Sequence, residues 1–186
     1  MGENRETELI REVLAGDPKP FEVLVRRYQG VIYNLMLRHA GGGDVAEDLA
    51  QEAFIRAYAR LETFRLGNRF FPWLYALAMN VVRDWMRKNG RDFHVYMDDP
   101  AVMADQDGGP DTARTAQRNM DGGRAFEAVM GLAPKYREAL ILRFRHDLSM
   151  QEISRALGIT VSGAKMRVSR GLELVRQQFE EASDAG

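Results

Sequence analysis

Apolar residues recur every three or four positions along most of the chain, and the alternation typical of strands is nearly absent. This spacing predicts amphipathic helices over residues 6–15, 20–39, 45–62, 72–89, 124–131, 134–145, 150–157 and 162–180. Residues 92–123 are poor in large apolar side chains and rich in Asp, Gly and Pro, which indicates a flexible linker. We therefore expect an all-α fold, with two small helical domains at 1–91 and 124–182 joined by that acidic linker.

The predicted helix over 45–62 has two contrasting faces. Small and apolar residues share one face, which we expect in the core: Ala46, Leu49, Ala53, Ala57, Leu61 and the following Phe64. Asp44, followed by Glu47, predicts a capped start. The opposite face carries Asp48, Gln51, Glu52 and Ile55. It is either a solvated surface or, because an apolar residue lies among acids, a surface that docks another protein.

Aromatic, basic and amide side chains are interleaved in the loop at 64–71 and on one face of the next helix. Rings stack on unpaired bases, amides hydrogen-bond to base edges and arginines neutralise phosphates, so the combination is typical of single-stranded nucleic-acid binding. The alternative is that the rings simply belong to the core. The candidate residues are Phe64, Arg65, Asn68, Arg69, Trp73, Asn80, Arg83 and Arg87.

The last third of the chain has the pattern of a helix-turn-helix. Ser149 and Glu152 form a capping box before a short helix, Gly158 supplies a turn, and Thr160 or Ser162 can cap a second helix. We expect the stripe of Val161, Ala164, Val168, Leu172 and Val175 to face the core. Lys165, Met166, Arg167, Ser169 and Arg170 then lie outside or on the flanks, where such a helix enters the major groove.

Charge is distributed in blocks. The 186 residues include 26 basic and 27 acidic groups, a net charge of −1 that by itself argues against a nucleic-acid-binding protein. Residues 65–95, however, hold 6 basic and 2 acidic groups, and residues 135–179 hold 9 and 4. Residues 96–123 hold 2 basic and 6 acidic groups. Since salt screens charge over about 10 Å, the local blocks decide what binds.

Several functional classes are excluded or disfavoured. The chain has no cysteine, and therefore no disulfide, thiolate zinc site, iron–sulfur cluster or cysteine nucleophile. The three histidines are scattered, and no nucleophile–base pair or phosphate-binding loop is present, so we expect neither catalysis nor a cofactor. The aspartates of the linker lack the EF-hand spacing, so we expect no metal. Without a signal peptide or a long apolar run, we expect a cytoplasmic protein.

Four stretches, taken in order, carry a resemblance to a known family. They are FEVLVRRY at 21–28, DVAEDLAQEAFIRAY at 44–58, FPWLYALAMNVVRDW at 71–85 and LSMQEISRALG at 148–158. The chain resembles the extracytoplasmic-function sigma factors, group IV of the sigma-70 family of bacterial RNA polymerase. The resemblance covers roughly residues 6–91 and 124–180.

The resemblance implies a sigma factor that binds core RNA polymerase and promoter DNA, and that an anti-sigma factor regulates. Asp48, Gln51, Glu52 and Ile55 would dock on the polymerase, and the aromatic and basic residues of 64–87 would hold the melted −10 element. The −35 element would be recognised by Arg143, Ser162, Gly163, Lys165, Met166, Arg167, Ser169 and Arg170. A different DNA-binding regulator with a helical sensor domain remains the alternative. It would explain residues 124–180, but not the acidic helix or the aromatic loop.

Overall fold

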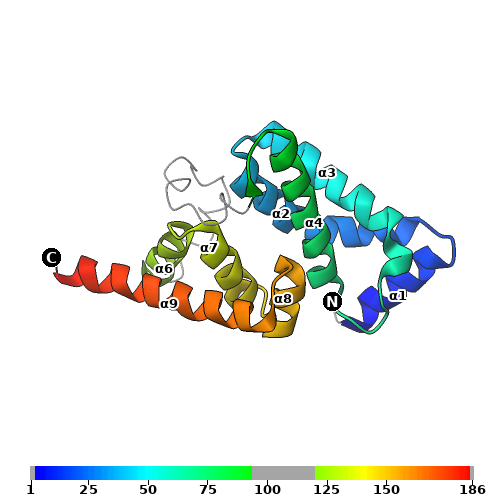
Figure 1. The fold of residues 1–186 in the computed structure, drawn as a ribbon. Helices are drawn as coiled ribbons and strands as arrows, with labels where there is room; N and C mark the ends of the chain where they lie inside the picture. Colours follow the sequence, from blue (N-terminus) through cyan, green and yellow to red (C-terminus); the bar gives the residue numbers. More distant parts are fainter. Residues whose placement is uncertain (1–2, 94–119, 185–186) are drawn as a thin grey trace. The chain divides into compact units, whose positions relative to one another are not determined.

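The computed structural model describes residues 3–93 and 120–184 of the chain, and within them it contains helices and turns but no strand (Figure 1). The all-α expectation is confirmed. The chain divides into two compact units, the first made mainly of residues 1–90 and the second mainly of residues after 90. Most of the predicted linker at 92–123 lies outside the described residues.

Every predicted helix is present, with ends shifted by up to four residues, except that the predicted helix over 134–145 is divided into an α-helix and a wide helical turn. The first unit contains α1 (Glu3–Leu14), α2 (Lys19–Ala40), α3 (Gly43–Ala59), the short 3₁₀ turn η1 (Leu61–Thr63) and α4 (Phe70–Lys88). The second contains α6 (Met120–Met130), α7 (Pro134–Leu140), the wide helical turn η4 (Ile141–Arg145), α8 (Met150–Leu157) and α9 (Val161–Asp184).

In the N-terminal unit, α3 packs against both α2 and α4. Its predicted inner face is confirmed: Ala46, Ala53 and Ala57 are fully buried, and Leu49 and Leu61 nearly so. Because alanine side chains are short, the neighbouring helices approach α3 closely and fill the core with larger residues of their own. This packing fixes the rotation of α3 about its axis, and with it the identity of the residues that face outward.

The connection between α2 and α3 corrects one expectation. Gly41 adopts a left-handed conformation (φ +74°), and its N–H donates to the carbonyl of Leu37 at 3.1 Å, which closes α2. Gly42 is extended and caps α3, which begins at Gly43 without a side-chain cap. The prediction that Asp44 caps this helix is therefore wrong. Asp44 lies in the first turn instead, where its carboxylate meets the positive end of the helix dipole.

A buried carboxylate ties α1 to α2. Glu6 is only 6% exposed; it accepts a hydrogen bond from the Tyr28 hydroxyl at 2.5 Å and pairs with Arg27 Nε at 3.0 Å. Burial, reinforced by the bond to Glu6, raises the pKa of the Tyr28 hydroxyl. The Tyr28 ring also stacks on Phe71 at 5.4 Å between centroids. Through Tyr28, α1 supports the start of α4.

The helix-turn-helix of the C-terminal unit forms as predicted. The Ser149 N–H and hydroxyl both donate to Glu152 Oε2, at 2.8 and 2.7 Å, and the Glu152 N–H returns a bond to Ser149 Oγ. Gly158 follows α8 with φ +66°, a conformation that favours glycine. Thr160 Oγ1 then accepts the Gly163 N–H at 3.0 Å and caps α9.

The inner stripe of α9 differs from the prediction at two positions. Ala164 and Val168 are buried, but Val161 and Leu172 are 36% and 37% exposed. Gly171 is buried instead of Leu172, and it packs against Leu140 of α7. A Cβ at residue 171 would lie 3.0 Å from Leu140 Cδ1. The glycine therefore lets α7 and α9 pack more closely than any larger residue would, which turns Leu172 outward.

This contact predicts opposite effects of the same substitution at two helical glycines. Gly171→Ala is expected to destabilise the C-terminal unit by about 1–2 kcal/mol, because overpacking outweighs the helix-propensity gain of alanine. Gly30→Ala in α2, where an added Cβ meets nothing within 4 Å, is expected to stabilise its unit by about 0.5–1 kcal/mol. Urea unfolding of the full chain, with hydrogen exchange to assign the unit, measures both. Stabilisation by both substitutions would contradict the close packing of α7 and α9.

Candidate nucleic-acid and protein interfaces

An aromatic cluster supports the loop that precedes α4. The rings of Phe64, Phe70 and Trp73 meet pairwise at centroid distances of 5.4–5.7 Å. Phe64 and Phe70 are 6% and 1% exposed, whereas Trp73 is half-buried. This corrects the expectation for Phe64: its ring lies in the cluster beneath Trp73 and is not open to a base. Trp73 is the aromatic residue of the predicted set that reaches the surface.

The loop itself presents polar groups on a defined turn. The backbone N–H and the Nδ2 of Asn68 both donate to the carbonyl of Arg65, each at 3.2 Å. The Arg65 and Asn68 side chains are exposed, and Arg69, at the extended residue that precedes α4, is half-buried. These two hydrogen bonds stabilise the backbone of the turn, and the Arg65 guanidinium remains at the surface.

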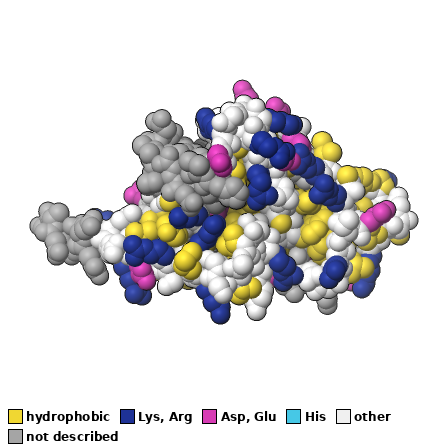
Figure 2. Space-filling model, in the orientation of Figure 1, with side chains coloured by type: hydrophobic (Ala, Val, Ile, Leu, Met, Phe, Trp, Pro, Cys, Tyr) yellow, Lys and Arg dark blue, Asp and Glu magenta, His cyan; other side chains and the backbone are white. Residues whose placement is uncertain are grey.

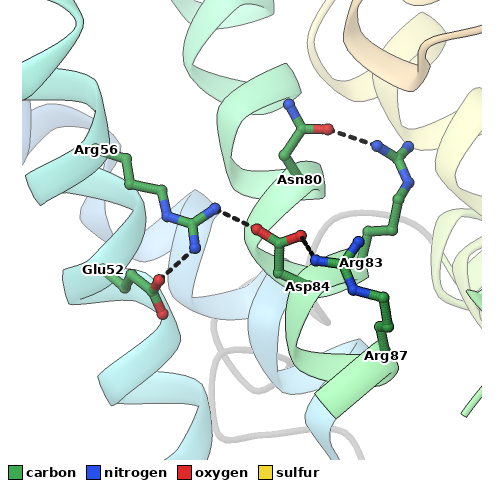
Figure 3. Close-up of polar contacts among 6 residues, drawn as sticks. All are labelled: Glu52, Arg56, Asn80, Arg83, Asp84 and Arg87. Carbon is green, nitrogen blue, oxygen red and sulfur yellow. Dashed lines mark hydrogen bonds and ion pairs between the residues drawn. The ribbon is translucent and has the colours of Figure 1, made fainter. Parts of the chain in front are cut away.

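One stripe of α4 continues this surface. Trp73, Asn80, Arg83 and Arg87 fall on one side of the helix at its 3.6-residue period. Asn80 and Arg83 are half-buried and joined by a hydrogen bond from Arg83 Nη1 to Asn80 Oδ1 at 2.5 Å, while Arg87 is exposed (Figure 3). Figure 2 shows several Lys and Arg side chains close together over the N-terminal unit in this view. The predicted mixture of aromatic, amide and basic groups is therefore brought together on one surface.

The outer face of α3 carries the residues predicted for protein docking. Asp48, Gln51 and Ile55 are exposed, Ile55 to 67%, and Glu52 is half-buried. An apolar side chain with acids on the same helix face is a combination that a protein-docking surface uses, because apolar area supplies affinity and charge supplies orientation. The structure therefore places all four predicted residues on one face, with the apolar residue at its centre.

An ion-pair network connects this face of α3 to the stripe on α4. Arg56 donates to Glu52 on its own helix at 2.5 Å and to Asp84 of α4 at 2.6 Å, and Asp84 also pairs with Arg87 at 3.0 Å (Figure 3). The hydrogen bond from Arg56, and then its charge and those of Arg87 and Lys88, lower the pKa of Asp84. Arg56 is not indicated by the sequence pattern, because its partner Asp84 lies 28 positions away and only Glu52 is within one turn.

The outer face of α9 is as predicted. Ser162, Lys165, Met166, Ser169 and Arg170 are exposed, Met166 to 62%, and Gly163 and Arg167 are half-buried. Arg170 pairs with Glu173 at 2.9 Å, with both side chains about half exposed. Arg143 is half-buried, and its Nη1 donates to the carbonyl of Leu148 at 3.0 Å. It therefore uses part of its hydrogen-bonding capacity to hold the loop before α8.

Residues 3–93 and 120–184 show neither a metal site nor a membrane-spanning helix. No group of three or more acidic or histidine side chains in these ranges is placed to hold a metal ion. None of the described helices is long and apolar enough to span a bilayer.

The network predicts a pH-dependent contribution to stability from Asp84. Because the pKa of Asp84 is lowered in the folded chain, its contribution is present above the ordinary aspartate pKa of about 3.9 and is lost as pH falls further through the lowered value. Asp84→Asn is expected to cost up to about 1 kcal/mol at pH 7, since the pair is partly screened by solvent. The difference from the unmodified chain should shrink below pH 4.

Glu22→Gln supplies the matched control for this measurement. Glu22 also pairs with an arginine at 2.6 Å, but both side chains are about 70% exposed, so a change below about 0.5 kcal/mol is expected. Urea unfolding at pH 7 and at several values between 5 and 3 gives the comparison. Equal costs for the two variants, or a cost of Asp84→Asn that does not vary with pH, would show that the network does not stabilise the unit.

Comparison with known proteins assigns both units. Residues 24–92 match the family model of Sigma-70 region 2, and residues 124–175 match that of Sigma-70, region 4. The ECF RNA polymerase sigma factor SigW of Bacillus subtilis (strain 168) is 35% identical over 185 residues, which cover 92% of this chain and 95% of SigW. The ECF RNA polymerase sigma-E factor of Escherichia coli (strain K12) is 32% identical over 179 residues, with 92% and 93% covered.

Solved structures agree at the level of the fold. CnrH, determined in complex with the cytosolic domain of CnrY, matches with a TM-score of 0.59 and 21% identity over 95% of this chain and 98% of CnrH. The sigma factor RpoE of Bartonella quintana, in complex with the anti-sigma factor NepR, matches with a TM-score of 0.64 and 24% identity over 87% and 98%. Because two sigma-70 region models match in order and relatives above 30% identity align along nearly their whole length, the chain belongs to the extracytoplasmic-function (ECF) family of RNA polymerase sigma factors.

Proposed function

We propose that this sigma factor binds core RNA polymerase through α3, holds the melted −10 element against α4 and its preceding loop, and recognises the −35 element as duplex through α9. Residues 1–91 form the unit for the first two tasks, 92–123 the linker, and 124–182 the unit for the third. The observation that carries the proposal is the separation of chemistry by surface: an acidic face with an exposed isoleucine on α3, and aromatic, amide and basic groups on α4.

The polymerase-binding surface is the face of α3 formed by Asp48, Gln51, Glu52 and Ile55. Ile55 supplies apolar area that water now covers, and the acids around it steer and orient a basic partner. Glu52 is held in place by Arg56, so it loses less side-chain freedom on binding than an unattached glutamate would.

The −10 surface combines the indole of Trp73, the amides of Asn68 and Asn80, and four basic residues: Arg65, Arg69, Arg83 and Arg87. An unpaired base can stack on Trp73, whereas the same base in a duplex is already stacked. Melting is thus favoured by contacts that only the open strand makes. Phe64 contributes from beneath, by supporting the indole of Trp73.

The −35 surface is the outer side of α9 with the loop that Arg143 braces. Lys165 and Arg170 supply phosphate contacts that set register, and Ser169, Met166 and Arg170 approach base edges. The exposed Met166 can contact a thymine methyl group, as apolar side chains do in the major groove. Ser162, Gly163 and Arg167 complete the surface near the start of the helix.

The protein regulates initiation and is not itself a catalyst; the polymerase, in the cytoplasm, performs the chemistry. We propose that an anti-sigma factor controls it. Bartonella quintana RpoE, which has a similar fold, forms a complex with the anti-sigma factor NepR, and this supports the proposal. The net charge of −1 is consistent with weak non-specific DNA affinity in the absence of polymerase, because acidic segments offset the two basic blocks.

The α3 surface predicts a charge-reversal phenotype. Asp48→Arg is expected to weaken binding to core polymerase by about tenfold or more, because it replaces an attraction across the interface with a repulsion. Glu12→Arg, the same charge change at an exposed position of α1, should alter the affinity less than twofold. Titration of core polymerase with fluorescently labelled chain measures both. Equal affinities of the two variants for core would refute the assignment of this face.

The two tryptophans predict a second, separable phenotype. Trp73→Ala is expected to reduce the equilibrium between open and closed promoter complexes by about ten- to a hundredfold, the value of one base–aromatic stack. Trp85→Ala, on the same helix but outside the stripe, should reduce it by less than threefold. Permanganate reactivity of unpaired thymines reports opening, and band shifts report closed-complex binding. Loss of closed-complex binding to the same degree as opening would contradict a role for Trp73 in the melted state.

A further inference from the structure

The bond between Arg83 and Asn80 decides which end of the Asn80 amide reaches the surface. A carboxamide carries an acceptor oxygen and a donor NH₂ group, and either end can face a neighbour. A guanidinium carries only donors, so it can bond only to the oxygen. Arg83 Nη1 lies 2.5 Å from Asn80 Oδ1, and Figure 3 shows Nδ2 pointing away from Arg83. The orientation of the amide is thus fixed by the chemistry of its partner.

Both residues lie where this orientation matters. Asn80 and Arg83 are half-buried in the stripe of α4 that begins with Trp73, so they are neither loose on the surface nor sealed in the core. The bond spans one helical turn and holds the two side chains against each other. Nδ2 points away from Arg83 and is the end of the amide that remains for another partner.

We propose that Arg83 is a specificity-determining positioning residue: by bonding to Asn80 Oδ1, it turns the amide so that Asn80 offers its Nδ2 donor to the unpaired strand. Asn80 therefore selects, at one position, a base whose exposed edge accepts a hydrogen bond there. The inference rests on the proposed function, because it needs the melted −10 element on this surface. It adds to that function the rule by which one polar group discriminates among bases.

Arg83 can also neutralise a phosphate. Comparison with Arg87 separates this role from the orientation of Asn80. Arg87 lies one turn further along the same stripe, carries the same charge and is 77% exposed. It pairs with Asp84 at 3.0 Å, whereas Arg83 bonds to Asn80. Removal of either arginine costs one positive charge, but only the loss of Arg83 leaves the Asn80 amide able to turn.

The test uses holoenzyme assembled from core polymerase and the full chain, with a promoter library randomised across the −10 element. Open complexes are selected and sequenced, which gives base preferences at every position. The variants are Asn80→Asp, Asn80→Ala, Arg83→Lys, Arg83→Gln and Arg87→Gln. Asn80→Asp is the sharpest, because it keeps the size of the side chain and the bond to Arg83 but offers an acceptor where the amide offered a donor.

At one −10 position, we expect the unmodified chain to prefer one base by about tenfold, the discrimination of a good polar contact. Asn80→Ala should flatten the preference there, and Asn80→Asp should change the preferred base to one that donates. Arg83→Lys should keep the original preference, since ammonium is also a pure donor. Arg83→Gln should flatten it, because glutamine can bond to either end of the amide. Arg87→Gln should weaken opening on all sequences and leave the preference unchanged.

Four results would overturn the inference. If Asn80→Asp gives the same base preferences as Asn80→Ala, the donor end of the amide does not discriminate among bases. If Arg83→Gln and Arg87→Gln both keep the base preferences of the unmodified chain, Arg83 contributes only its positive charge. Failure of the unmodified holoenzyme to open any promoter would overturn the proposed function along with it, whereas sharp −10 preferences that no Asn80 or Arg83 variant changes would overturn this inference alone.

Discussion

The alanine face of α3 is buried against α2 and α4, and this close packing decides which residues of the N-terminal unit meet solvent. Three fully buried alanines leave little room for rotation of the helix. Asp48 and Ile55 consequently face outward, and Arg56, on the flank, comes within 2.6 Å of Asp84 on α4. A larger residue on the inner face would separate the helices and break that bridge. The positions of the protein-docking face and of the DNA-facing stripe therefore both depend on the packing of α3 against α2 and α4.

The −10 surface has a second support, from the aromatic residues beneath it. Phe64 and Phe70 are buried, and Trp73 rests on both, so the indole is held in place before any ligand arrives. Tyr28 joins Phe71 to the same cluster, and the buried carboxylate of Glu6 fixes Tyr28. Because side chains that are already ordered lose little entropy on binding, this arrangement favours contact with an unpaired strand. The apolar cluster and the polar stripe are thus parts of one interface.

In the C-terminal unit, the spacing between α7 and α9 depends on the absence of a side chain. Gly171 allows Leu140 to approach the backbone of α9, which sets how α9 is rotated about its axis. Lys165, Met166, Ser169 and Arg170 are exposed as a result. A glycine in the middle of a helix, which propensity alone would count as a cost, here has a packing reason.

The sequence by itself determined the helices, the two-domain organisation, the capping box at Ser149 and the faces of α3 and α4, because these depend on periodicity and on interactions within one turn. It left open whether Phe64 belongs to the core or to the nucleic-acid surface, and it did not determine that Gly42 caps α3 or that Leu172 turns outward. The Arg56–Asp84 bridge joins residues 28 positions apart and follows from the helix packing alone. These features required the tertiary structure, because the distance of closest approach between two helices depends on side chains from both, and no local pattern contains that information.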